Sequence, residues 1–160
     1  MSSNPAARPN VLPWPPMLYG AAILLAILAE RLIPLAIALP WAVRAAGGAL
    51  TLLGVACDLW AVATLHGART TILPHRAATR LITHGPFRFT RNPIYVGNTI
   101  AMIGLGVAFA APWVIVFGLV AAILVDRLAI RREEAHLAAR FGAVWAQYCR
   151  RTPRWLGRAG

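Results

Sequence analysis

The sequence predicts an all-α integral membrane protein, a helical bundle of about four transmembrane helices followed by a C-terminal amphipathic helix. Three observations lead to this fold class. Of the 160 residues, 59% are hydrophobic, whereas an ordinary soluble domain is about 45–50% apolar. The apolar residues gather in runs of the length that a membrane-spanning helix needs. The sixteen cations are all arginines, and thirteen of them lie after residue 65, between and beyond the apolar runs.

The order of these runs predicts a single domain over residues 1–160. The first span is expected over 13–31 and the second over 43–65, each near the 20 residues that cross a bilayer. The two later apolar runs are shorter, which predicts some tilt adjustment or bilayer thinning. The expected parts are a flexible N-terminus (1–12), two spans (13–65), a polar loop (66–93), a helical hairpin (94–130), and a helix with its tail (131–156).

The charge distribution predicts an orientation and excludes one class of partner. Arginine-rich segments that flank spans stay on the cytoplasmic side, so the polar loop, the tail and both termini are expected there, in a bacterial inner membrane. Because the formal charge of +11 is divided among such segments, no nucleic-acid partner is expected. Cys57 and Cys149 lie in different settings and predict no disulfide framework. The four histidines lack metal-ligand spacing, so no metal is expected. Nothing indicates the oligomeric state.

The polar segment that leads into the third span carries candidate binding residues. Pro93 suits the first turn of a helix, and the free N–H groups of that turn favour an anion. Arg88 and Arg91 add donors for a carboxylate, and Tyr95 follows within the same turn. These residues predict a ligand with a carboxylate and a ring. They fit a cytoplasmic loop with a helix cap equally well, and both interpretations stay open here.

Three carboxylates complete the candidate site. Arg131 begins an Arg-Arg-Glu-Glu run thirty-six residues after Tyr95, about the length of a passage across the membrane and back. Glu133 and Glu134 are therefore expected at the same face as the polar loop, for chemistry or for pairing with neighbouring arginines. Asp58 lies within an apolar run, where a carboxylate is costly and is by default a functional hypothesis. The alternative for Asp58 is a pair with an arginine of the loop.

Two sets of residues resemble a known family over about residues 66–156. The first is the run Gly85-Pro86-Phe87-Arg88, followed by Arg91-Asn92-Pro93-Ile94-Tyr95-Val96-Gly97. The second set is Arg132-Glu133-Glu134, Phe141-Gly142, Tyr148 and Pro153-Arg154-Trp155-Leu156, and Thr70–His75 resembles the stretch that precedes the loop. Together they resemble the isoprenylcysteine carboxyl methyltransferases and the related membrane phospholipid methyltransferases. Asn92 stands where histidine is commoner in that family, so this position offers a neutral amide in place of an imidazole.

The resemblance implies a membrane methyltransferase that uses S-adenosylmethionine. The implied acceptor is lipophilic, an isoprenylcysteine-like carboxylate or another lipid or isoprenoid carboxylate, entering from the bilayer. Glu134, Glu133 and Arg91 are the candidate catalytic residues, and Arg154 and Asp58 are candidates for binding the substrate. The cofactor is expected to contact residues of the loop and the later helix, namely His84, Gly85, Pro86, Arg91, Asn92, Pro93, Tyr95, Gly97 and Glu134.

Two other functions fit the same sequence. An NADPH-dependent membrane reductase of the same superfamily would use Arg69, Arg76 and Arg80 to hold phosphates. A non-enzymatic membrane scaffold would keep its function in Tyr95→Phe, Arg91→Ala and Glu134→Gln variants. Cofactor binding separates these functions from methyl transfer.

Overall fold

The computed structural model describes residues 14–68 and 81–157. The expectations for the N-terminus, for Thr70–His75 and for Arg69, Arg76 and Arg80 lie outside this part of the chain. The described residues form helices and connecting segments, and no strand is found among them. In chain order the elements are α1 (Trp14–Leu32), α2 (Trp41–Gly67), the 3₁₀ helix η2 (Gly85–Arg88), α3 (Pro93–Ala108), α4 (Pro112–Val125), the π-helical turn η3 (Asp126–Ile130) and α5 (Arg131–Arg151).

The helices confirm the predicted all-helical membrane fold. Within the described residues, three helical segments are long and apolar enough to span a membrane: α1, α2 and the continuous run that begins with α4. α3 is also apolar but has 16 residues, about 24 Å at 1.5 Å per residue. The first two spans were expected over 13–31 and 43–65, and the structure has α1 over Trp14–Leu32 and α2 over Trp41–Gly67.

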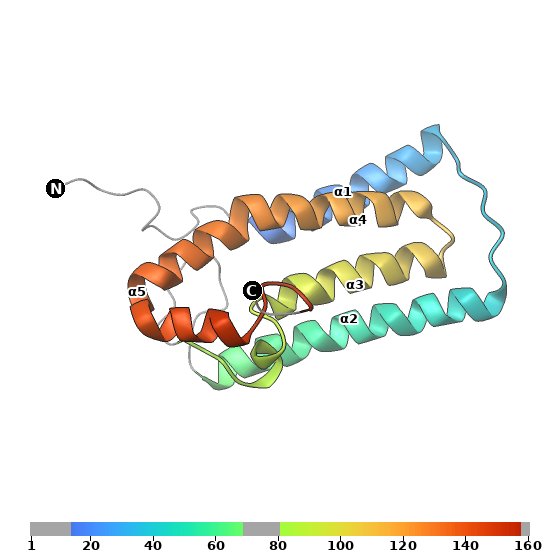
Figure 1. The fold of residues 1–160 in the computed structure, drawn as a ribbon. Coiled ribbons are helices and arrows are strands. Elements are labelled where there is room, and N and C mark those ends of the chain that lie inside the picture. The colour runs from blue at the N-terminus through green and yellow to red at the C-terminus, as the bar shows by residue number, and fades with distance from the viewer. Residues whose placement is uncertain (1–13, 69–80, 158–160) are drawn as a thin grey trace.

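The four apolar helices run alongside one another, and their order places the polar segments together. α3 packs against α2 and α4, and α4 also packs against α1. Figure 1 shows the α1–α2 connection and the α3–α4 turn at one end of the bundle. The opposite end holds η2, α5 and the C-terminal segment. The passage from α3 through α4 therefore brings the start of α3 and the start of α5 to the same end, as predicted.

Glycines allow α2 and α3 to pack closely. A Cβ atom on Gly47 would lie 2.5 Å from the backbone nitrogen of Ala108, and one on Gly54 would lie 2.6 Å from the carbonyl oxygen of Gly97. Real Cβ atoms essentially never lie within 3.0 Å of such neighbours, so only glycine fits at these two positions without a shift of the backbone. Small residues that let backbones approach are typical of helix packing in membranes. The α2–α3 pair therefore provides a close-packed base for the loop that precedes α3.

The segment from α4 to α5 changes direction twice. The π-helical turn η3 joins the two helices, and such turns are often found at functional sites. Within α5, Gly142 adopts φ 50° and ψ −121°, which kinks the helix. After the kink, Trp145 and Tyr148 are buried, whereas Val144 is 61% exposed.

Candidate active site

The loop that precedes α3 is held from two sides. Gly85 has φ +61°, a left-handed conformation that favours glycine, and a Cβ there would lie 2.8 Å from Oγ1 of Thr64 in α2. On the other side, the hydroxyl of Tyr148 in α5 donates to the carbonyl of Phe87 at 2.6 Å. Pro86 is buried between these contacts. The loop thus has a defined position between α2 and α5.

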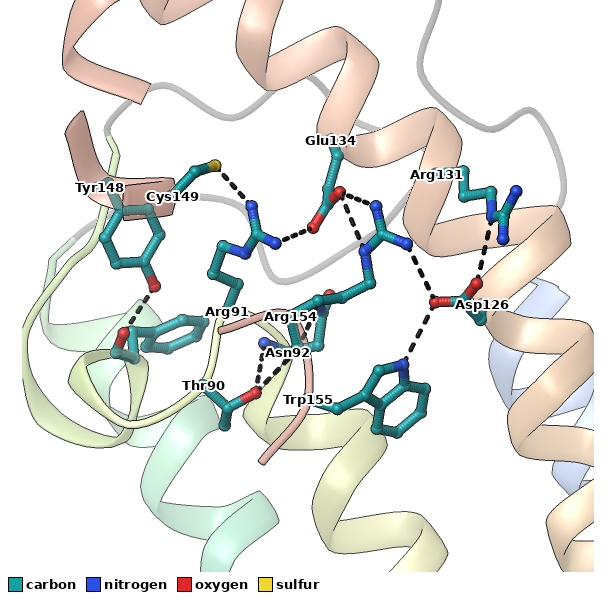
Figure 2. Close-up of polar contacts among 11 residues, drawn as sticks. Thr90, Arg91, Asn92, Asp126, Arg131, Glu134, Tyr148, Cys149, Arg154 and Trp155 are labelled. Carbon is teal, nitrogen blue, oxygen red and sulfur yellow. Dashed lines mark hydrogen bonds and ion pairs between the residues drawn. The ribbon is translucent and has the colours of Figure 1, made fainter. Parts of the chain in front are cut away.

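The end of this loop binds the C-terminal segment over residues 153–156, which is called the strap below. The amide of Arg91 donates to the carbonyl of Pro153 at 2.9 Å. The carbonyl of Arg154 accepts from Oγ1 of Thr90 at 2.9 Å and from Nδ2 of Asn92 at 3.0 Å. Figure 2 shows these side chains beneath the strap. Asn92 therefore has a role here that an amide donor performs without a titratable group.

Glu134 is the centre of a charged cluster made by three separate segments. Its Oε2 atom accepts from Nη2 of Arg154 at 2.6 Å and from Nε of Arg154 at 3.1 Å. Its Oε1 atom lies 3.5 Å from Nη2 of Arg91. The hydrogen bond to Glu134 is the main cause that raises the pKa of Arg154 above its ordinary value. Both candidate arginines therefore lie at the candidate carboxylate.

Two atoms of this cluster retain hydrogen-bonding capacity. Nε of Arg91 and Oε1 of Glu134 are buried, and neither has a hydrogen-bond partner among the described residues. The remainder of the Arg91 guanidinium is fixed, because Nη1 donates to Sγ of Cys149 and the group lies 5.7 Å from the centre of the Trp145 ring. Buried polar atoms normally have partners. One donor and one acceptor of the cluster thus lack a hydrogen bond, although Oε1 of Glu134 also lies in the ion pair with Arg91.

The neighbouring carboxylate, Glu133, faces a different element. The hydroxyl of Tyr95 donates to Oε1 and Oε2 of Glu133 at 3.1 and 3.3 Å. The carbonyl of Tyr95 in turn accepts from the hydroxyls of Thr99 and Tyr19, at 2.7 and 3.3 Å. Glu133 therefore connects α5 to α3 and, through Tyr95, to α1.

The predicted residues Asp58, Gly97 and His84 also lie outside the charged cluster. Asp58 packs against α3, where a Cβ on Gly97 would lie 2.0 Å from its Oδ1 atom. That oxygen is buried and has no hydrogen-bond partner among the described residues. The ion pairs found among those residues involve Glu134 and Asp126, not Asp58. Gly97 serves the packing of α2 and α3. His84 is exposed, and its carbonyl accepts from the amide of Phe87 at 3.2 Å.

Asp126 is a polar centre that sequence reasoning missed. At the start of η3, its carboxylate accepts from Nε of Arg131 at 3.1 Å and from Nε1 of Trp155 at 3.2 Å. It also lies 3.6 Å from Nη1 of Arg154. Arg131 thus pairs with Asp126, rather than with the Glu pair. The signal that could have found Asp126 was the rarity of acidic residues. The chain has five of them, and Asp126 lies two helical turns before Glu133.

A cavity of about 840 Å³ lies beside the cluster. Its walls come from α3, α4, η3, the start of α5 and the strap, and they include Arg91, Asp126 and Arg154. This volume is within the usual range for small-molecule sites. The geometry therefore combines a partly buried charged cluster with an adjacent space large enough for a ligand.

Fold and site together define a helical membrane protein with a polar site at one end of its bundle. Residues 42–144 match the model of the family described as phospholipid methyltransferase. This match covers more than half of the chain, which therefore belongs to that family of membrane methyltransferases, and the resemblance predicted from the motifs is confirmed. The matched region includes the loop, α3 and the Glu pair, but it ends before the strap.

The chain is also similar to two bacterial proteins over about half of its length. It is 34% identical over 88 residues to the nickel-cobalt-cadmium resistance protein NccN of Alcaligenes xylosoxydans xylosoxydans, covering 52% of this chain and 38% of that protein. It is 35% identical over 83 residues to the cobalt-zinc-cadmium resistance protein CzcN of Cupriavidus metallidurans, with the same two coverages. The chain thus spans 38% of the length of these relatives.

Proposed function

We propose that the protein is an S-adenosylmethionine-dependent methyltransferase that acts on a lipophilic acceptor at the charged end of the bundle. Family membership supports methyl transfer. The observation that carries the choice of cofactor is that two buried atoms of the cluster, Nε of Arg91 and Oε1 of Glu134, have no hydrogen-bond partner among the described residues. S-adenosylmethionine has a carboxylate and an ammonium group on one carbon. A guanidinium N–H suits the carboxylate, and a carboxylate oxygen suits the ammonium.

The residues around this pair have distinct proposed roles. Arg91 and Glu134 would bind the amino-acid part of the cofactor, and Arg154 keeps Glu134 in place through two hydrogen bonds. Glu133 would contribute negative charge near a sulfonium, positioned by Tyr95. Asn92 and Thr90 hold the strap that closes one side of the site. His84, Gly85, Pro86 and Pro93 act through the shape of the loop.

S-adenosylmethionine would supply the methyl group. A lone pair of the acceptor would form the new bond to the methyl carbon while the carbon–sulfur bond breaks, and the electron pair of that broken bond would stay on sulfur. The protein's residues would position the two reactants and exclude water. A carboxylate acceptor needs no general base, because its oxygen already carries the attacking pair. The proposed acceptor is accordingly a lipid or isoprenoid carboxylate, such as an isoprenylcysteine.

Calorimetric titration of the purified protein in detergent tests this function. S-adenosylmethionine is expected to bind, and Glu134→Gln is expected to weaken binding at least roughly ten-fold, because hydrogen bonds to charged groups contribute about 1.5–3 kcal/mol. Glu30→Gln is the matched control. It removes the same charge, but Glu30 lies near the end of α1 that leads into the α1–α2 connection, at the opposite end of the bundle from Glu134. No heat of binding at millimolar cofactor would refute the proposal. Preferential binding of NADPH would favour the reductase instead.

A further inference from the structure

Arg88 does not join the candidate active site, although the sequence grouped it with Arg91. It is exposed, and it is absent from the described residues that line the cavity. Its guanidinium lies instead 4.5 Å from the centre of the Phe89 ring. All five acidic residues of the chain belong to its described part, and none of them pairs with Arg88 there. Arg88 is therefore an exposed cation without an acidic side chain as its partner.

An exposed aromatic pair lies beside this cation. Phe89 and Trp60 of α2 are each 50% exposed, and the centres of their rings are 6.3 Å apart. They meet because η2 packs against α2 (Figure 1), where a Cβ on Gly85 would touch Thr64, one helical turn beyond Trp60. Trp60, Arg88 and Phe89 are called the aromatic–arginine surface below.

The position of Trp60 along α2 places this surface at the edge of the hydrocarbon core. α2 is long and apolar enough to span a membrane, and its first residue, Trp41, is 81% exposed. The two tryptophans are nineteen residues apart, which is about 29 Å along a helix and close to the ~30 Å of hydrocarbon in a bilayer. Exposed leucines lie between them, including Leu52 and Leu59. Tryptophans gather at the two interfaces of a bilayer, so Arg88 lies at the level of the lipid headgroups.

The nearest acidic residue in the sequence does not offset this charge. Asp58 lies two residues before Trp60, which is about 200° around the helix, and it packs against Gly97 of α3. Its carboxylate is therefore on the opposite side of α2 from the aromatic–arginine surface. A headgroup that carries its own cation would meet Arg88 without a carboxylate to hold that cation, so the charge of the surface favours an anionic headgroup.

We propose that the aromatic–arginine surface binds the headgroup of an anionic phospholipid, as a structural partner and not as the methyl acceptor. A guanidinium stacked on an aromatic ring keeps the N–H groups at its edge for the oxygens of a phosphate. The rings of Trp60 and Phe89 contact the glycerol and the first carbons of the acyl chains. Among the described residues, those that line the cavity beside Glu134 do not belong to α2 or η2. The bound lipid is therefore separate from the proposed reaction.

The loop that carries this surface is attached to the candidate active site at the residues on either side. The carbonyl of Phe87 accepts from the hydroxyl of Tyr148, and the hydroxyl of Thr90 donates to the carbonyl of Arg154 in the strap. A headgroup at Arg88 lies between these two contacts. The bound lipid therefore holds the loop at the bilayer surface without contacting the charged cluster.

Fluorescence quenching by brominated lipids tests the surface, because Trp60 belongs to it. The protein, without cofactor, is placed in phosphatidylcholine vesicles that contain either dibrominated phosphatidylglycerol or dibrominated phosphatidylcholine. The signal of Trp60 is the difference between the parent and Trp60→Phe. Phosphatidylglycerol is expected to associate with Trp60 roughly five-fold more strongly, as one arginine near an anionic membrane surface provides. Equal quenching by the two lipids, or displacement of the phosphatidylglycerol by millimolar inorganic phosphate, would overturn the proposal.

Two arginines that lie over aromatic rings provide the matched comparison. Arg88→Gln is expected to reduce the lipid preference to near one, with a melting temperature close to that of the parent, whereas Arg88→Lys keeps the charge and most of the preference. Arg140 is also exposed and lies 5.9 Å from the centre of the Phe141 ring, but on α5. Arg140→Gln is expected to leave the preference unchanged. A preference that persists in Arg88→Gln, or that falls equally in Arg140→Gln, would contradict the assigned surface, whatever the outcome of the cofactor titration.

Discussion

Glu133 and Glu134 are adjacent in the chain, yet their carboxylates have different partners. Glu133 accepts from the hydroxyl of Tyr95, whereas Glu134 binds Arg154 and lies close to Arg91. Neighbours on a helix point about 100° apart, so each carboxylate meets a different element. Glu133 thus has a neutral contact and Glu134 has cationic contacts, which suits the separate roles proposed for them.

Asn92 provides a prediction at the scale of one residue. Its Nδ2 atom donates to the carbonyl of Arg154. Asn92→Asp replaces this donor by an acceptor and is expected to destabilise the protein by about 1–3 kcal/mol, with faster proteolysis of the strap. Asn92→His restores an N–H donor and is expected to recover much of the loss. Limited proteolysis and thermal unfolding in detergent measure both effects, and equal behaviour of the two variants would contradict the assigned role.

The elements of the fold differ in how tightly they pack. α2 and α3 approach until only glycine fits at Gly47 and Gly54, whereas the strap is held mainly by a few hydrogen bonds and ion pairs. A close-packed pair of helices gives the start of α3 a fixed position. The site therefore combines a rigid floor with a side closed by polar contacts.

Two neighbouring glycines of α2 test this packing. A Cβ on Gly47 would lie 2.5 Å from the backbone of Ala108, but a Cβ on Gly48 meets nothing within 4 Å. Gly47→Ala is expected to lower the free energy of unfolding by about 1–3 kcal/mol through overpacking. Gly48→Ala is expected to be neutral or slightly stabilising, because alanine favours helix. Thermal unfolding in matched detergent compares the two, and the opposite order would contradict the packing of α2 on α3.

At the scale of the whole molecule, the antiparallel course of the helices assembles the site. α3 and α4 cross the bundle and return, so the loop before α3 meets the Glu pair after η3 (Figure 1). The same end carries most of the described arginines. By the positive-inside rule, this end is proposed to face the cytoplasm.

Accessibility of single cysteines tests this orientation. In a variant without Cys57 and Cys149, Leu35→Cys places a thiol in the exposed α1–α2 connection, and Arg140→Cys places one on the exposed surface of α5. In intact cells a membrane-impermeant maleimide is expected to label position 35 and not position 140. In inverted vesicles the pattern is expected to reverse. Labelling of position 140 from outside would reverse the proposed topology.

The sequence by itself determined the helical elements, their limits and the end at which the motifs meet. Hydropathy and helix length depend on local composition, so the two early spans and the hairpin of α3 and α4 follow from counting residues. The family motif could likewise be recognised from its spacing, and the family match agrees with it.

Only the tertiary structure decided which polar groups became partners. Sixteen arginines are equivalent by type, and the choice of Arg91 and Arg154 for Glu134 depends on where the strap crosses the loop. Asp126 acquired Arg154 and Trp155 as partners because η3 directs it toward that strap, and Asp58 packs on Gly97 because α2 and α3 approach so closely. Helix periodicity is encoded locally, whereas the partner of a side chain depends on packing between segments far apart in the chain.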